Sequence, residues 1–195
     1  YHLIETVERA DNRIATDKSG FVIENDAYWW KPNEVFFKTG KQHQCMGFTF
    51  KYPDSDDITD EQLSSISSYM NTVEEAIFKN DGSAADYIDY ESFARWILVH
   101  DILGSSDAAG SNMFLYKEVF EENNPVSSKL KMATLWDFDT SFKRSATEWS
   151  AQHIHSVFYY PQLFKDKAFV KKYLELYNAY KDKVYSYVES YFNDL

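Results

Sequence analysis

The apolar positions follow a strand-like pattern in the first 52 residues and a helical pattern in much of the remaining chain. In the first part, short apolar runs are separated by Gly and polar turn residues, which is typical of β-strands joined by tight turns. This pattern predicts strands at residues 3–7, 21–24, 34–38 and 46–51. We therefore expect an α+β protein whose N-terminal part is an antiparallel β region.

A first helix is predicted after this β region. Thr59 is followed three residues later by Gln62, which is the spacing of a capping box, and the helix should end near residues 80–82, which include a Gly. Its apolar positions share one face, formed by Leu63, Ile66, Met70, Val73 and Ile77. Glu74 and Glu75 lie beside this face, and we expect both side chains to be solvated.

A second helix is predicted between Asp89, which suits an N-cap, and Gly104, which suits a helix end. Its apolar and aromatic positions recur at helical spacing, at Phe93, Trp96, Ile97 and His100. His100 is followed by Asp101, but the pair lies inside the helix without an obvious nucleophile. We therefore interpret this His–Asp pair as structural.

The chain beyond about residue 142 carries no motif with a chemical meaning. Residues 143–162 have an irregular pattern, and residues 164–191 predict one or two helices with a Tyr-rich face. A length of 195 residues without internal repeats suits one domain, and an apolar content of 44% argues against disorder. The 15 Tyr and five Trp residues favour core packing over a sugar-binding face.

Four polar residues follow the order that phosphoryl-transfer enzymes use. Asp107 is followed five residues later by Asn112, and Asp137 and Asp139 come after two further apolar runs. Protein kinases take an acceptor-binding Asp and a metal-binding Asn from one loop, and a second metal-binding Asp from just past a β-hairpin. The order predicts that Asp107 orients or deprotonates the acceptor hydroxyl. Asn112 and Asp137 would bind Mg²⁺ or Mn²⁺, with Asp139 as a second ligand or a supporting hydrogen-bond acceptor.

The two apolar runs, residues 113–118 and 130–135, predict the hairpin, because the link between them has the composition of a turn. Taken singly, each polar residue also has an ordinary explanation as a turn former or a loop acceptor. If the chain near Asp137 is extended, its side chain and that of Asp139 share one face. The aromatic residues beside the two acids are then packing residues that fix them.

These motifs resemble the spore-coat protein H (CotH) kinase-like family. The resemblance is carried by the four polar residues above and by residues 1–8, 20–24, 50–54, 87–93, 115–117 and 136–139. It extends to about residue 142. The resemblance implies an atypical protein kinase fold, with ATP and Mg²⁺ or Mn²⁺ as cofactors and Ser side chains of secreted or coat proteins as substrates. It also implies an extracytoplasmic location.

A kinase also needs a small lobe, with a Lys that binds the α- and β-phosphates and a Gly-rich cover over the nucleotide. The six glycines of this chain form no close-spaced loop, and residues 3–5 would suit the last strand of a small lobe. We therefore interpret residues 1–195 as one large-lobe domain that lacks most of this cover and binds nucleotide weakly or not at all. Lys51 is either a substitute phosphate ligand or, more simply, a solvated side chain beside a turn. In an intact kinase, a carboxylate on the first helix, Glu74 or Glu75, would be able to pair with a phosphate-binding Lys.

Charge and composition exclude several kinds of partner. The formal net charge of −11, from 31 acidic and 20 basic residues, opposes binding to nucleic acids and to anionic membranes. No run of 18 apolar residues predicts a membrane span. Cys45 is the single cysteine, so neither an intrachain disulfide nor a Cys-based metal site is expected. Nothing in the pattern predicts an oligomeric state.

Two other functions are compatible with the same residues. The first is a non-catalytic surface module that keeps a kinase-like shell and binds a protein or a glycan. The aromatic run at residues 28–30 would anchor such a partner. The second is a metal-dependent hydrolase that uses the same acids. Dependence of nucleotide binding on metal separates a kinase from both, because only a kinase needs ATP and metal to bind together.

Overall fold

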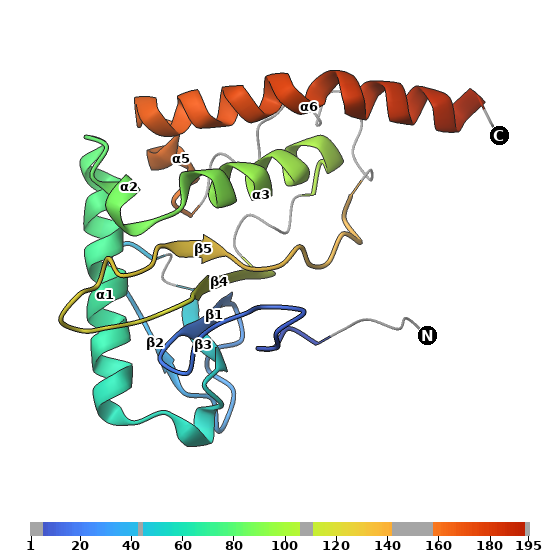
Figure 1. Ribbon diagram of the computed structural model, residues 1–195. Helices are drawn as coiled ribbons and strands as arrows, with labels where there is room; N and C mark the ends of the chain where they lie inside the picture. The colour runs from blue at the N-terminus through green and yellow to red at the C-terminus, as the bar shows by residue number, and fades with distance from the viewer. Residues whose placement is uncertain (1–5, 43–44, 106–110, 142–157, 194–195) are drawn as a thin grey trace.

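The computed structural model of the 195-residue chain describes residues 6–42, 45–105, 111–141 and 158–193 (Figure 1). A β-sheet forms one layer of the fold. Helix α1 stands against this sheet, while α3 and then α6 lie beyond its β5 edge. This arrangement is of the α+β class, as the sequence predicts.

Within the described residues, five strands form one antiparallel sheet in the order β2-β3-β1-β4-β5. They are β1 (Phe21–Asp26), β2 (Phe36–Phe37), β3 (Gly47–Tyr52), β4 (Met113–Lys117) and β5 (Leu130–Met132). The predicted hairpin is present as β4 and β5, and β4 pairs with β1 so that Phe21 lies opposite Lys117. The N-terminal strands and the hairpin therefore form a single sheet, because strands far apart in sequence can hydrogen-bond through their backbones.

Two of the predicted N-terminal strands differ from the structure. The strand expected at residues 34–38 is reduced to Phe36–Phe37. Residues 3–5 lie outside the described residues, and Thr6 and Val7 are not part of a strand. Thr6 and Val7 instead begin a segment that is held by local turns, which the alternation of apolar residues does not reveal.

Helix α1 (Asp60–Lys79) begins and ends where the sequence predicts. Thr59 and Gln62 form a complete capping box, and Asn80 ends the helix in the left-handed conformation with φ 55°. Tyr69 of α1 packs edge-on against Phe21 of β1, with 6.2 Å between ring centroids. The apolar face of α1 therefore closes the core of the sheet, and a short 3₁₀ turn, η1 (Ser55–Asp57), leads into it.

Glu74 of α1 corrects the expectation that it is solvated. Its side chain lies in the core and its residue is only 1% exposed, whereas the neighbouring Glu75 is exposed. The Glu74 carboxylate accepts hydrogen bonds from the hydroxyls of Thr39 and Tyr159, each at 2.5 Å, and from the backbone N–H of Lys41 at 2.8 Å. These three donors come from two other parts of the chain, so the sequence near Glu74 gives no sign of them.

Helix α3 (Tyr90–Leu103) fixes the edge strand β5 and the segment that follows it. The Asp89 carboxylate caps α3 by accepting from two backbone N–H groups, and the Asp89 N–H donates to the Leu130 carbonyl at 2.9 Å. Further along α3, Ser92 Oγ accepts from the Met132 N–H at 2.9 Å, and Trp96 Nε1 donates to the Thr134 carbonyl at 3.2 Å. This row of bonds satisfies the outer edge of β5 and guides the chain toward Asp137.

The remaining helices are α2 (Ala84–Tyr87), α5 (Tyr160–Leu163) and α6 (Lys167–Asn193). The C-terminal region is thus one long helix, α6, which packs across α3 and extends beyond it (Figure 1). The expectation of irregular structure at 143–162 is wrong for α5, where Pro161 lies in the first turn and Tyr160 is fully buried. Residues 142–157 lie outside the described part. No helix in the described part of the chain is long and apolar enough to cross a membrane.

Candidate functional site

Asn112 and Asp137 lie next to each other although they are 25 residues apart in sequence. Asn112 directly precedes β4, and Asp137 follows the segment that continues β5. Because β4 and β5 are antiparallel, the start of β4 lies near the end of β5. The Asn112 Nδ2–H donates to Asp137 Oδ2, with 3.3 Å between the nitrogen and the oxygen. The structure therefore brings together two of the four polar residues.

Both members of this pair have a backbone in the left-handed region. The φ angle is 56° at Asn112 and 53° at Asp137. Asn and Asp are among the non-Gly residues that adopt this conformation most readily, but it still costs free energy. The chain at Asp137 is therefore not extended, so the condition for Asp137 and Asp139 to share one face is not met. The surrounding packing must hold this geometry in place.

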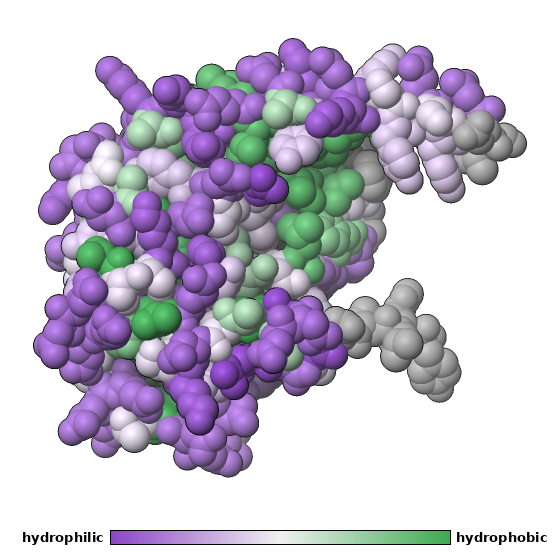
Figure 2. Space-filling view, viewed as in Figure 1, coloured by the Kyte–Doolittle hydropathy of each residue, from purple (hydrophilic) through white to green (hydrophobic). Residues whose placement is uncertain are grey.

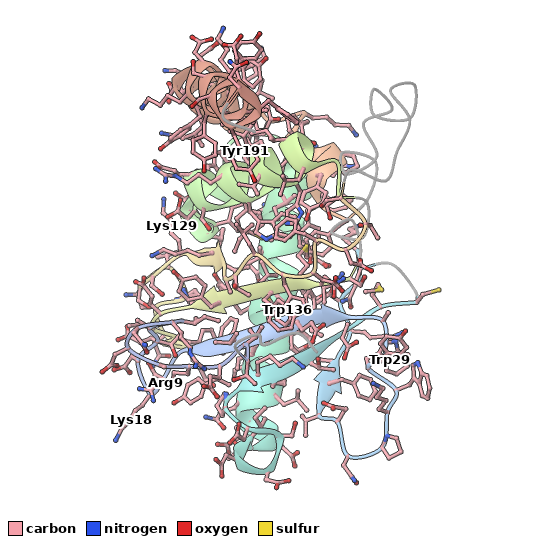
Figure 3. The ribbon with its side chains drawn as sticks, turned by 90° about the vertical axis from the view of Figure 1, so that its right-hand side faces the viewer. Arg9, Lys18, Trp29, Lys129, Trp136 and Tyr191 are labelled. Atoms are coloured by element: carbon pink, nitrogen blue, oxygen red, sulfur yellow. The ribbon has the colours of Figure 1, made fainter. Side chains whose placement is uncertain are left out.

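The aromatic neighbours of Asp137 provide that packing. Phe138 stacks on His100 of α3, with ring centroids 5.0 Å apart and an interplanar angle of 15°. Trp136 packs edge-on against Phe114 of β4, with 6.0 Å between centroids. Figure 3 looks onto this side of the molecule and shows the labelled Trp136 over the strands of the sheet. Asp137 is thus flanked by two rings that are anchored on α3 and β4.

His100 itself is a buried imidazole that has no hydrogen-bond partner among the described residues. It is 1% exposed, and neither Nδ1 nor Nε2 has a partner within the part of the chain that the structure describes. Its ring also contacts Trp96, with 4.0 Å between centroids. Burial lowers the pKa of His100 to about 4, although nearby Asp101 opposes this shift. His100 is therefore neutral at pH 7 and acts in this site as a packing surface.

A cavity of about 830 Å³ lies beside Asp137 and Asp139. One wall is the segment before β1, and the other is the segment after β5. The described residues that line it are Thr6, Val7, Glu8, Asn12, Arg13, Ile14 and residues 133–139. A volume of this size is within the range of small-molecule and cofactor sites, which is roughly 300–1,000 Å³.

The wall before β1 is held by hydrogen bonds within its own turn and to the sheet. Arg9 Nε donates to the Thr16 carbonyl at 2.8 Å, and the Ala10 N–H donates to the Ile14 carbonyl at 3.3 Å. The Asp17 N–H then donates to the Glu118 carbonyl at 2.8 Å. Sequence reasoning missed this wall, because no periodic pattern distinguishes a lining segment from a polar turn.

A second, smaller cavity of about 440 Å³ adjoins the first. The two share Ala133, Thr134 and Leu135, so they meet along the segment that follows β5. Glu91 and Arg95 of α3 line the smaller cavity and form an ion pair at 2.6 Å. Figure 2 shows hydrophobic residues gathered below α6, on the side toward which the segment after β5 runs.

Of the other candidate residues, Asp107, Asp139 and Lys51, the last two can be placed relative to the larger cavity. Asp107 lies outside the described residues. Asp139 lines the larger cavity together with Asp137. Lys51 is half-buried and pairs with Glu24 at 2.8 Å, and it is not among the described lining residues. Burial raises the pKa of Glu24, and its ion pair with Lys51 opposes that shift.

The oxygen atoms of Asn112, Asp137 and Asp139 are suited to a hard divalent cation such as Mg²⁺, which prefers carboxylate, amide and water ligands. In the part of the chain that the structure describes, no group of three or more His, Cys, Asp or Glu side chains is arranged to hold a metal ion. A cation here would therefore depend on the amide of Asn112, and on phosphate and water oxygens, in addition to the two acids. That composition is typical of Mg²⁺ bound with a nucleotide.

The comparison with protein families agrees with this geometry. The family model described as CotH kinase protein matches residues 1–195. The chain belongs to the CotH kinase family. A comparison with curated protein sequences gave no match, and a comparison with solved structures gave none either. Membership of the CotH family makes this a kinase-like protein of the transferase class.

Proposed function

We propose that this CotH-family chain carries the catalytic site of an atypical protein kinase, which transfers phosphate from ATP to Ser residues of secreted or surface proteins. The observation that carries the proposal is the hydrogen-bonded pair of Asn112 and Asp137 beside an 830 Å³ cavity. A kinase-like large lobe places its metal ligands in this way, one before a hairpin and one after it.

The residues of the pair would hold Mg²⁺ or Mn²⁺ against the phosphates of ATP. Asp137 would supply the main carboxylate ligand, and Asn112 would supply its amide oxygen. Asp139, on the same cavity wall, would be a second ligand or would accept a hydrogen bond that orients the loop. When bound, the cation supplies positive charge that neutralises the charge growing on the transferred phosphoryl group.

The larger cavity would bind the nucleotide. Its apolar side chains, among them Val7, Ile14 and Trp136, would contact the base, and its acids would face the metal–phosphate end. The adjoining 440 Å³ cavity would receive the protein acceptor, because it meets the nucleotide cavity at Ala133–Leu135 and carries charges of both signs.

Asp107 would bind the Ser hydroxyl of the acceptor and take its proton. The Ser oxygen then forms a bond to the γ-phosphorus while the bond between that phosphorus and the ADP oxygen breaks. The protein forms no covalent bond to the transferred phosphoryl group in this reaction. These residues therefore act mainly by positioning the reactants and by electrostatic stabilisation. The CotH family suggests spore-coat or surface proteins, and we place the reaction outside the cytoplasm on that basis.

The proposal is tested by measuring nucleotide binding and phosphoryl transfer. ATP is added up to millimolar concentration while the NMR signals of the Trp side chains are recorded. Binding should be seen only when Mg²⁺ or Mn²⁺ is present. Phosphate from labelled ATP should then appear on Ser residues of a Ser-rich peptide, identified by mass spectrometry. Asp107→Asn and Asp137→Asn should remove transfer. Metal-independent ATP binding, or no binding at millimolar concentration, would overturn the proposal.

A non-catalytic binding module is the second candidate, and one observation favours it. Tyr28 and Trp30 are 58% and 63% exposed, and the Lys31 ammonium lies 4.6 Å from the centre of the Tyr28 ring. Exposed aromatic side chains of this kind often anchor a partner. Binding of a protein or glycan at this patch, in a chain that binds no nucleotide, would favour this candidate over the kinase.

A further inference from the structure

Arg13 is the one cationic side chain among the described residues that line the 830 Å³ cavity. The same lining contains three acids, Glu8, Asp137 and Asp139. A bound cation would offset part of this negative charge, but the phosphates of a nucleotide carry further negative charge. An arginine in this position would therefore increase the affinity of the cavity for an anionic ligand.

The position of Arg13 is held by a tight turn and by neighbouring side chains, among them Thr6 and Glu8. Its backbone N–H donates to the Ala10 carbonyl at 3.0 Å. Its Nη1 donates to Thr6 Oγ1 at 3.3 Å and forms an ion pair with the Glu8 carboxylate. Arg13 is an exposed residue overall, while its side chain is 27% exposed and so is partly covered by its neighbours. The guanidinium is thus held at the cavity by the wall itself.

The Arg13 guanidinium can exchange its Glu8 partner for a phosphate at a small cost in free energy. The Glu8 side chain is 53% exposed, so its carboxylate can turn into water and be solvated there. A guanidinium presents parallel N–H donors that match two phosphate oxygens, and bonds between charged groups of this kind are among the strongest hydrogen bonds in proteins. A phosphate would therefore compete well with Glu8 for Arg13.

We propose that Arg13 binds the phosphate groups of the nucleotide, and that its ion pair with Glu8 gives way when the phosphate binds. This inference rests on the proposed function, because it assumes that the cavity takes a nucleotide. It assigns to Arg13 the role considered for Lys51 from the sequence. Lys51 pairs with Glu24 on the sheet and is not among the described residues of the cavity wall.

The test compares three probes on the same protein: Mg²⁺–ATP, Mg²⁺–tripolyphosphate and adenosine. Arg13→Gln should weaken the first two by roughly tenfold or more, the loss expected for one charge-assisted bond, and leave adenosine binding unchanged. Lys51→Gln makes the same charge change and is the matched control, with little effect on any probe. Glu8→Gln should strengthen the two phosphate probes, because it removes the competitor for Arg13.

The outcomes separate this inference from the proposed function. If the parent protein binds ATP with metal and Asp137→Asn prevents it, but Arg13→Gln has no effect, the inference about Arg13 is wrong while the proposed function stands. A loss caused by Lys51→Gln in place of Arg13→Gln would overturn it in the same way. If the parent protein binds neither ATP nor adenosine, both proposals fail.

Discussion

Glu74 and Asp137 are two carboxylates in opposite situations. Glu74 is 1% exposed and accepts hydrogen bonds from Thr39, Lys41 and Tyr159. Asp137 is exposed, accepts a longer bond of 3.3 Å from the Asn112 amide and has a left-handed backbone. Glu74 joins helix α1 to the segment after β2 and to the start of α5, whereas Asp137 lies on the wall of a cavity.

The difference teaches how this fold separates a structural acid from the acid that we propose to be functional. A buried carboxylate is tolerated only when hydrogen-bond donors replace its water, and Glu74 has three donors. Such a group contributes to stability and has little capacity left for a ligand. Asp137 is in contact with solvent, and the free-energy cost of its backbone is a mark of functional sites. We therefore expect changes at Glu74 to act on folding and changes at Asp137 to act on activity.

The largest effect is expected for Asp137→Asn, measured as phosphoryl transfer to a Ser-rich peptide. Transfer should fall by roughly 10³-fold or more, because the main carboxylate for the metal is lost. The free energy of unfolding should change by only about 0.5 kcal/mol, since Asn tolerates the same φ and is solvent-exposed. Activity equal to that of the parent would remove Asp137 from the mechanism. A large loss of stability would instead erase the contrast with Glu74.

The next largest effect is expected for Glu74→Leu, measured by urea denaturation. This change leaves the hydroxyls of Thr39 and Tyr159 and the Lys41 N–H buried without an acceptor. We expect a loss of about 3 kcal/mol in the free energy of unfolding. Glu75→Leu, one residue along the same helix, is the matched control and should change stability by about 0.5 kcal/mol or less. Equal effects of the two variants would contradict the structural role of Glu74.

A third prediction concerns His100, which is buried like Glu74 but has no hydrogen-bond partner in residues 6–42, 45–105, 111–141 and 158–193. Its pKa is about 4 in the folded protein and near 6.5 in the unfolded chain. Between these pH values the unfolded chain binds a proton that the folded protein does not. The free energy of unfolding should therefore fall as the pH is lowered from 6.5 to 4, by up to about 3 kcal/mol.

The control for this pH effect is His100→Phe, which keeps a ring against Phe138 and Trp96 but cannot be protonated. Denaturant unfolding of both proteins should be compared at several pH values between 4 and 7. The stability of the parent should decrease more steeply on acidification than that of the variant. Parallel pH profiles would mean that His100 gains a partner or becomes hydrated.

The smallest effect is expected for Asp139→Asn, in the same transfer assay as Asp137→Asn. Asp139 lines the cavity, but the Asn112 amide donates to Asp137, so we expect Asp139 to reach the metal through water or through the loop. We expect a loss of roughly tenfold, typical of a group that supports a metal ligand. Double replacement should be little worse than Asp137→Asn alone. A larger loss at Asp139 than at Asp137 would reverse the assignment of the two acids.

The sequence by itself determined the features that depend on neighbouring residues. The capping box of Thr59 and Gln62, the N-cap at Asp89 and the helix end at Gly104 are present as predicted, because each depends on groups within one or two helical turns. The β4–β5 hairpin follows from two apolar runs and a turn between them. The order of the polar residues also led to the family, which the family model shows over the whole chain.

Only the tertiary structure decided which distant groups meet. The burial of Glu74 depends on Thr39 and Tyr159, which lie 35 and 85 residues away in sequence. The hydrogen bond between Asn112 and Asp137 needs the register of β4 and β5, and their left-handed backbones are not visible in any pattern of residues. The wall that contains Arg13 likewise becomes part of a cavity only when its segment lies against residues 133–139. Local signals fix where elements begin and end, whereas burial and charge pairing arise from contacts that form only when the chain is folded.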